Sequence, residues 1–223
     1  LRYFKRLVAK DDGIVQHILE RHPIYQNQTH DQLMNIELHL EAFGDRLRVV
    51  EMIRHPVDLV DSWMRREWGH RFGQDPRALT LCVRWNDHDV PYYAVGWEEQ
   101  YVSATPLGRV MRMIAFVWDA SQSAYQALPP RQQRQVCFVP FEAFVQRPDA
   151  YLPTLAQFLE TQISRHTRRA VRHQRCPRAY SLEDQQARAQ RIARDARPEE
   201  RQLLQRLVDE YHTVVDSRTT VHG

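Results

Sequence analysis

The sequence predicts an α/β domain in which a parallel sheet is flanked by helices. Two apolar, β-branched runs of strand length occupy residues 47–53 and 135–139, and each is followed by a segment with helical spacing of apolar residues. The order strand, helix, strand, helix over residues 24–68 is the repeating unit of a parallel α/β sheet. With 223 residues and 43% hydrophobic composition, the chain fits one large domain spanning residues 1–223.

The first predicted unit lies near the N-terminus. Residues 24–28 form a short strand candidate, and Asp31 is a suitable N-cap for the helix that follows. Gly44 ends this helix, because glycine is the common residue just past a helix C-terminus. The apolar face of the helix holds Leu33, Ile36 and Leu40.

The second unit contains the most informative segment. The strand at residues 47–53 ends at Arg54-His55-Pro56, and Pro56 is well placed in the first turn of a helix. Ser62 follows Arg54 by eight residues and lies within that helix. An arginine at the end of a strand and a hydroxyl near a helix N-terminus suit the binding of a phosphate group.

Beyond this unit the pattern changes. Residues 65–105 lack periodicity and are rich in aromatic residues, so we expect a long loop that lines an acceptor site or packs onto the core. Residues 107–128 return to helical spacing, residues 136–139 form a buried strand, and another helix follows Pro148.

The C-terminal part is expected to be helical. Ser181 begins one helix in a capping-box pattern and Pro198 begins another. The segment before them is dense in arginine: Arg168, Arg169, Arg172, Arg175 and Arg178.

Two blocks of the chain carry a resemblance to a known family. The spacing Arg-x-Pro-x-Asp-x-x-x-Ser from Arg54 to Ser62 resembles the segment with which sulfotransferases hold the 3′-phosphate of 3′-phosphoadenosine 5′-phosphosulfate. A second block, residues 107–160, is similar to the family pattern in its order of a tryptophan-containing helix, a strand, a turn and a further helix, and matches it at Glu142 and at Phe158-Leu159. It departs from that pattern at Phe141, Ala143 and Glu160, where tyrosine, aspartate and glycine are usual.

The resemblance implies a P-loop-type sheet and an enzyme that moves a sulfuryl group to a hydroxyl or amine acceptor. The co-substrate would be 3′-phosphoadenosine 5′-phosphosulfate, and no metal is implied. Arg54 and Ser62 would hold its 3′-phosphate, with Arg175 and Arg178 as further candidates for the same group. Phe141 would present its ring to the adenine.

The implied catalytic base is His30, which follows a threonine at the place where cytosolic sulfotransferases carry a threonine-histidine pair. An imidazole titrates near neutral pH and could accept the proton of the acceptor. Some relatives use a carboxylate instead, so Glu37 and Glu41 stay open as alternatives.

The family's lysine-bearing loop for the 5′-phosphosulfate has no counterpart in the sequence, which contains no G-x-x-x-x-G-K-[ST] pattern. The chain opens on Leu1 without an initiating methionine. We therefore expect that the N-terminal strand and this loop have been lost by truncation or processing.

The composition limits the classes of partner that the protein can be expected to bind. Net charge is only +3, which argues against broad nucleic-acid binding, and Lys5 and Lys10 are the only lysines among 31 basic residues. Three cysteines without C-x-x-C spacing indicate reduced thiols in a cytoplasmic protein, and no apolar run is long enough to span a bilayer. The acceptor could be a small molecule, a glycan or a lipid.

Two other interpretations remain at this point. The chain could be a non-enzymatic, arginine-rich module that binds an anionic partner through residues 168–178 and 188–201. It could also be a nucleotide kinase or a glycosyltransferase of related architecture that binds phosphates at a strand end. The sequence leaves the oligomeric state undetermined.

Overall fold

The structure is a computed structural model that describes residues 31–71 and 81–218, together with residues 13, 16, 19, 20 and 26–29. The chain divides into two compact units, Leu1–Gln32 and Leu33–Gly223, and every element named here belongs to the second. Its helices and strands are α3 (Ile36–Phe43), β1 (Val49–Ile53), α4 (Pro56–Arg65), α5 (Trp68–Arg71), β2 (Cys82–Trp85), β3 (His88–Pro91), α6 (Glu98–Ser103), α7 (Pro106–Ala127), α8 (Pro130–Gln133), β4 (Val136–Pro140), α9 (Phe141–Gln146), α10 (Pro148–Phe158), α11 (Arg165–His173), α12 (Leu182–Asp195) and α13 (Pro198–Arg218).

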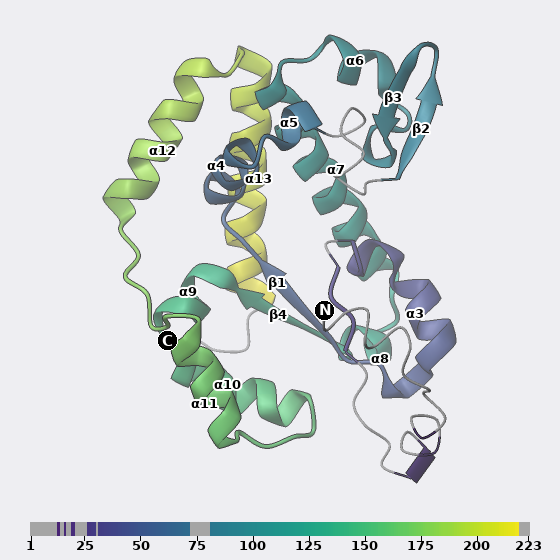
Figure 1. The fold of residues 1–223 in the computed structure, drawn as a ribbon, viewed down its shortest axis with the longest axis vertical. Helices are drawn as coiled ribbons and strands as arrows, with labels where there is room; N and C mark the ends of the chain where they lie inside the picture. Colours follow the sequence, from purple (N-terminus) through teal and green to yellow (C-terminus); the bar gives the residue numbers. More distant parts are fainter. Residues whose placement is uncertain are drawn as a thin grey trace. The chain divides into compact units, whose positions relative to one another are not determined.

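The predicted α/β architecture with parallel strands is confirmed. β1 and β4 pair in parallel, with Val49 opposite Val136 and Ile53 opposite Pro140, and Figure 1 shows them side by side. The intervening chain crosses from one strand to the other through helices, as a parallel pair requires. Among the described residues, this sheet contains two strands, and β2 and β3 form a separate antiparallel hairpin.

Helices cover both faces of the parallel pair, which suits strands made of continuous apolar residues. Alternate side chains of β4 point to opposite faces. Val136 and Phe138 pack in a cluster with residues of α3 and α13, whereas Cys137 and Val139 pack against Tyr151 of α10. By the same alternation, Glu51 of β1 lies on the face of Val49 and Ile53, among apolar neighbours, and burial raises the pKa of its carboxyl to about 7.

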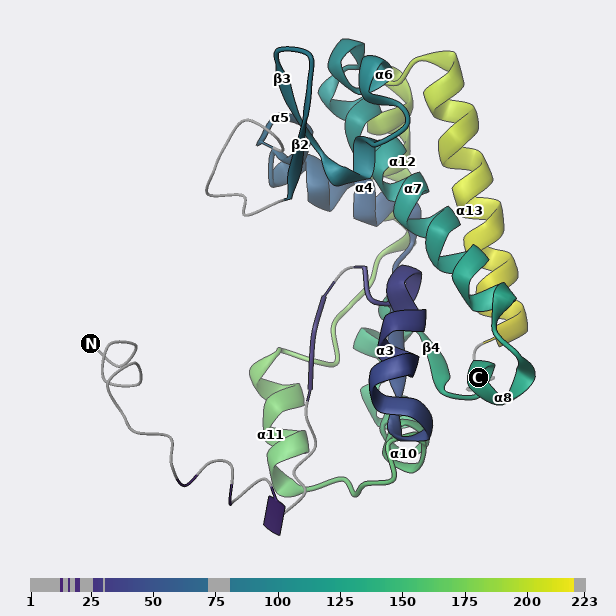
Figure 2. The same cartoon turned by 90° about the vertical axis from the view of Figure 1, so that its right-hand side faces the viewer.

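A larger apolar cluster joins α4, α7, α12 and α13, and Figure 2 shows the long helices α7 and α13 side by side. Local signals place the ends of several helices as predicted. Pro56 occupies the first turn of α4, Gly44 follows α3 with a φ of 55°, and the Ser181 hydroxyl accepts a hydrogen bond from the Asp184 amide at the start of α12.

Four expectations differ from the structure. Asp31 is not the N-cap of α3, because the α-helix begins at Ile36 with Asn35 at its N-cap, after a 3-10 turn over Leu33–Asn35. Residues 26–28 have no regular structure, so they do not form the predicted strand. Residues 65–105 are not one aperiodic loop, because they contain α5, the β2–β3 hairpin and α6. Their aromatic side chains pack onto the core: Tyr101 is 3% exposed, and Trp85, Tyr93 and Trp97 contact the same cluster. The arginine-dense segment contains α11, which apolar periodicity did not indicate.

Candidate functional site

The candidate site begins where β1 and β4 end. Because Ile53 is paired with Pro140, the next residues, Arg54 and Phe141, leave the same edge of the sheet together. The guanidinium carbon of Arg54 lies 5.1 Å from the centre of the Phe141 ring, which is a cation–π distance. The carboxyl ends of parallel strands are where open α/β sheets bind their ligands.

The buried carboxylate of Glu142 links this edge of the sheet to α13 through hydrogen bonds. Glu142 is 8% exposed, and its carboxylate accepts hydrogen bonds from the His55 amide (3.2 Å) and from the Tyr211 hydroxyl (3.1 Å). Burial raises the pKa of the Glu142 carboxyl, and hydrogen bonds from these groups oppose that rise. Its Oε1 lies 3.8 Å from Arg54 Nε, close enough for attraction but beyond hydrogen-bond distance.

Arg54 is therefore only partly satisfied by the protein. Its Nε is buried and has no hydrogen-bond partner within the described part of the chain. Its side chain keeps 30% of its surface exposed, and its ring contact with Phe141 leaves the fork of amino groups open to a ligand. A buried donor without a partner is unusual in proteins, and an anion beside Arg54 would supply one.

His55, the next residue, has a different role. It is 8% exposed, packs edge-on to Tyr211 at 5.2 Å, and its Nδ1 is buried without a hydrogen bond to another described residue. Burial lowers the pKa of His55 to about 4, so the imidazole is neutral near pH 7. The ring of His55 packs against Tyr211 next to the end of β1.

Asp58 forms the second wall of the site. It is 4% exposed and its carboxylate accepts hydrogen bonds from Arg188 Nε (2.7 Å), Gln185 Nε2 (3.3 Å) and the Tyr180 hydroxyl. Burial raises the pKa of the Tyr180 phenol, and the neighbouring Asp58 carboxylate adds to that effect. These bonds fasten α12 and the segment before it to the first turn of α4.

A pocket of about 220 Å³ lies between these walls. Three of the residues predicted to bind the nucleotide, Arg54, Phe141 and Arg178, line it together. Four arginines outnumber three carboxylates in the lining, so the pocket favours an anion. The full lining is Arg54, Asp58, Arg65, Phe141, Glu142, Val145, Arg178, Ala179, Tyr180, Ser181, Asp184 and Arg188.

Arg178 is held in place by its backbone and its side chain. Its amide donates to the Val145 carbonyl at 2.7 Å, which ties the segment before α12 to α9. Its Nε and Nη2 donate to the Gln174 carbonyl at 3.2 and 2.9 Å, so one terminal nitrogen, Nη1, has no partner among the described residues.

The structure separates the remaining predicted site residues. Ser62 lies on the face of α4 that carries Asp58 and Arg65, both of which line the pocket, but Ser62 is not part of the lining. Arg175 is exposed beyond the end of α11 with a φ of 56° and is not part of the lining. His30 lies outside the described residues.

Sequence reasoning missed Tyr180, Arg188 and Tyr211. Tyr180 and Arg188 lie 122 and 130 residues beyond Asp58 in the chain, and nothing in the local pattern of any of them indicates these partners.

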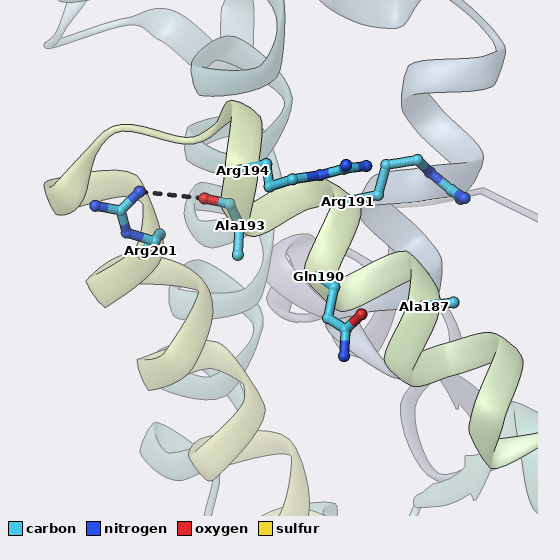
Figure 3. Close-up of a pocket in the computed structure, with 6 residues that line it drawn as sticks. All are labelled: Ala187, Gln190, Arg191, Ala193, Arg194 and Arg201. Atoms are coloured by element: carbon cyan, nitrogen blue, oxygen red, sulfur yellow. Dashed lines mark hydrogen bonds between the residues drawn. The ribbon is translucent and has the colours of Figure 1, made fainter.

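A second hollow, of about 720 Å³, is lined by α12 and by Arg201 of α13 (Figure 3). Its arginines include groups that already serve the fold. Arg201 donates to the carbonyls of Ala193 and Ala196 at the end of α12, and Arg191 pairs with Asp61 at 3.1 Å. The residues that line this hollow include arginines of the 188–201 segment but no strand end, no aromatic ring and no predicted nucleotide ligand, so the smaller pocket at the strand ends is the better candidate site.

Three further findings bear on function. No group of three or more His, Cys, Asp or Glu side chains suited to a metal ion occurs within the described residues. In that same part of the chain, no helix has both the length and the apolar character needed to cross a bilayer. Compared with known proteins, the chain matches no family model, no curated protein and no solved structure.

Proposed function

We propose that the pocket at the carboxyl ends of β1 and β4 binds the adenosine 3′-phosphate end of 3′-phosphoadenosine 5′-phosphosulfate, and that the protein is a sulfotransferase. The observation that carries this proposal is the convergence of Arg54, Phe141 and Arg178 on one pocket. These residues come from three distant places in the sequence, and they are three of the five residues that the sequence predicts as nucleotide ligands. The parallel β1–β4 pair would then be part of a P-loop-type sheet.

The residues in the pocket fit such a ligand. The buried, unpartnered Nε of Arg54 offers a donor to a phosphate oxygen, and the free Nη1 of Arg178 offers another. The Phe141 ring already lies against the Arg54 guanidinium, so a flat adenine could extend this stack. Ser62, one turn beyond Asp58 on the same face of α4, would add a hydroxyl.

The proposed reaction is an in-line transfer. A bond forms between the acceptor oxygen or nitrogen and sulfur, the bond from sulfur to the 5′-phosphate oxygen breaks, and the acceptor proton passes to a base. We propose His30 as that base, with Glu37 or Glu41 as the carboxylate alternative. Arg54 and Arg178 would orient the nucleotide by binding its 3′-phosphate, away from the reacting sulfur. Correct orientation is a large part of catalysis in group transfer.

The acceptor remains a small molecule, a glycan or a lipid in this proposal. Residues 81–101 carry the exposed edge of the β2–β3 hairpin beside the packed aromatic cluster. We assign the acceptor to this side of the protein, and slower hydrogen exchange in these residues when an acceptor is added would support the assignment. Unchanged exchange there would count against it.

Calorimetry with 3′-phosphoadenosine 5′-phosphate tests the proposal. Arg54→Ala should weaken binding by ~2–3 kcal/mol, because a charge-assisted hydrogen bond to a buried phosphate is removed. Ser62→Ala should lose less, ~1 kcal/mol, because a neutral hydroxyl bond is exchanged for water. Arg66→Ala is a matched control, since Arg66 is exposed at the end of α4 and does not line the pocket.

Adenosine 5′-phosphosulfate, which lacks the 3′-phosphate, separates a lost contact from a damaged fold. The Arg54 and Ser62 variants should bind it as weakly as the parent protein does. Equal losses for both ligands would mean that the substitutions damage the fold, and no loss for either ligand would place the nucleotide elsewhere.

A further inference from the structure

Helix α11 carries a stripe of arginines along one face. Its four arginines are separated by steps of three, one and three residues, so at 3.6 residues per turn they fall within an arc of about 100°. All four are exposed, and no residue of α11 is buried. The stripe consists of Arg165, Arg168, Arg169 and Arg172.

The arginines of this stripe have no anionic partner within the described residues. The helix contains no acidic side chain, and none of the four guanidinium groups forms an ion pair or hydrogen bond with another described residue. Two of the three arginines of the next helix in the chain, α12, differ, because Arg188 pairs with Asp58 and Arg191 pairs with Asp61. The positive charge of α11 is therefore available to a ligand.

The stripe does not serve the stability of its own helix. Arg165 places a cation at the helix N-terminus, where the macrodipole favours an anion, and the first turn has no acidic residue. Like charges four residues apart, as in Arg165–Arg169 and Arg168–Arg172, are unfavourable on a helix surface. The helix is held instead by a capping box between Ser164 and Thr167.

We infer that the α11 stripe is a docking surface for a linear acidic polysaccharide that carries sulfate or carboxylate groups. Arginines on successive turns of the helix lie ~5.4 Å apart along its axis, so they can contact successive anionic groups along an extended chain. Arginine forks bind planar or tetrahedral oxyanions through two parallel hydrogen bonds. This surface does not depend on the proposed sulfotransferase activity.

The chemistry of α11 favours this ligand over other polyanions. Residues 161–179 contain no Phe, Tyr or Trp, so this segment lacks the large rings on which nucleic-acid bases stack best, and its only rings are the imidazoles of His166 and His173. The helix exposes no row of large apolar residues of the kind that inserts into a membrane surface. The low net charge of +3 means that attraction of a polyanion must come from local clusters of positive charge, of which the stripe is one.

The stripe is connected to the strand-end pocket. The carbonyl of Gln174, just past α11, accepts both hydrogen bonds of the Arg178 guanidinium, and Arg178 lines that pocket. Figure 1 shows α11 followed by the extended segment that leads to α12. A polysaccharide bound along α11 would end close to Arg178.

The test is calorimetry of the full chain with a heparin octasaccharide at low and at higher salt. Changing all four stripe arginines to Gln should weaken binding by at least ~30-fold and flatten the dependence of affinity on salt. A matched control removes the same charge elsewhere: Arg66→Gln, Arg84→Gln, Arg131→Gln and Arg134→Gln, all at exposed positions. The control should bind within about threefold of the parent.

A variant with Lys at the four stripe positions keeps the charge and should bind within about tenfold of the parent. A Lys variant as weak as the Gln variant would overturn the electrostatic account, as would equal losses in the stripe variant and the control. Absence of heparin binding would overturn the inference itself. So would tighter binding of a DNA duplex or of phosphatidylserine vesicles that depends on the same four arginines.

Discussion

The charged groups at the strand ends and those on α11 stand in opposite environments. Asp58 and Glu142 are almost fully buried and each accepts at least two hydrogen bonds, which fasten α12 and α13 to the sheet edge. The arginines of α11 are exposed and have no partner among the described residues. Arginine therefore has two separate roles in this protein. At the strand ends it stabilises the fold through buried ion pairs, and on α11 it is free to bind an anionic ligand.

Asp58→Ala should have the largest effect on stability. It leaves Arg188 and Tyr180 without their buried acceptor, and removal of one partner of a buried ion pair costs ~3–5 kcal/mol. Urea unfolding would measure this loss. Asp61→Ala is the control, because Asp61 pairs with two exposed arginines, Arg65 (71% exposed) and Arg191 of α12 (54% exposed), and pairs with exposed partners are each worth less than ~1 kcal/mol. Equal losses of unfolding free energy for the two variants would contradict the claim that the buried ion pair stabilises the fold more than the exposed pairs do.

The second effect concerns Glu51, which is half-buried and has no ion pair or hydrogen bond from its side chain to another described residue. The pKa of its carboxyl is about 7 in the folded protein, above its ordinary value of 4.5, so ionisation destabilises the fold as the pH rises through this range. Glu51→Gln should be more stable than the parent at pH ~8, by up to ~3 kcal/mol, with no difference below pH ~4.5. Unfolding free energies measured across this range would check it, and a gain independent of pH would contradict the assignment.

His55 should give the free energy of unfolding the opposite dependence on pH, in the parent protein and in the Glu51→Gln variant alike. Its pKa is about 4 in the folded protein and 6.5 in the unfolded chain, so protons bind preferentially to the unfolded chain between these values. Stability should therefore fall as the pH drops from ~6.5 to ~4. His55→Gln, followed by the same unfolding measurements, should lose this slope, and an unchanged slope would show that another group causes it.

The smallest effect is expected on α11. Replacing the four stripe arginines with Gln should change the free energy of unfolding by no more than ~1 kcal/mol, in the stabilising direction at low salt, because like-charge pairs worth ~0.2–0.5 kcal/mol each are removed. Thermal unfolding at low and high salt would measure the change. A clear destabilisation would show that these arginines do support the fold.

Local patterns were sufficient for much of the fold and for part of the site. The β-branched run of β1, Pro56 at the start of α4 and the left-handed Gly44 were all predictable, because short-range sterics and burial determine them. Arg54 and Phe141 were each selected as candidates, but their contact depends on the parallel register of two strands 87 residues apart in sequence. A single sequence contains no record of that register.

The features that were missed have other physical causes. The partners of Asp58 and Glu142 come from α12, α13 and the segment before α12, and tertiary packing alone brings them together. Helix α11 was missed because it buries no apolar face and depends on the cap at Ser164, so it has no apolar periodicity to detect. The aromatic segment has no detectable periodicity because its strands and helices each span only a few residues.

The structure of the protein bound to 3′-phosphoadenosine 5′-phosphate tests the central claim most directly. We predict that the 3′-phosphate lies within hydrogen-bond distance of the Arg54 guanidinium and that the adenine packs against Phe141. Contact with Arg178 Nη1 should accompany it. Nucleotide bound in the hollow between α12 and α13, or on the α11 stripe with the strand-end pocket empty, would contradict the account.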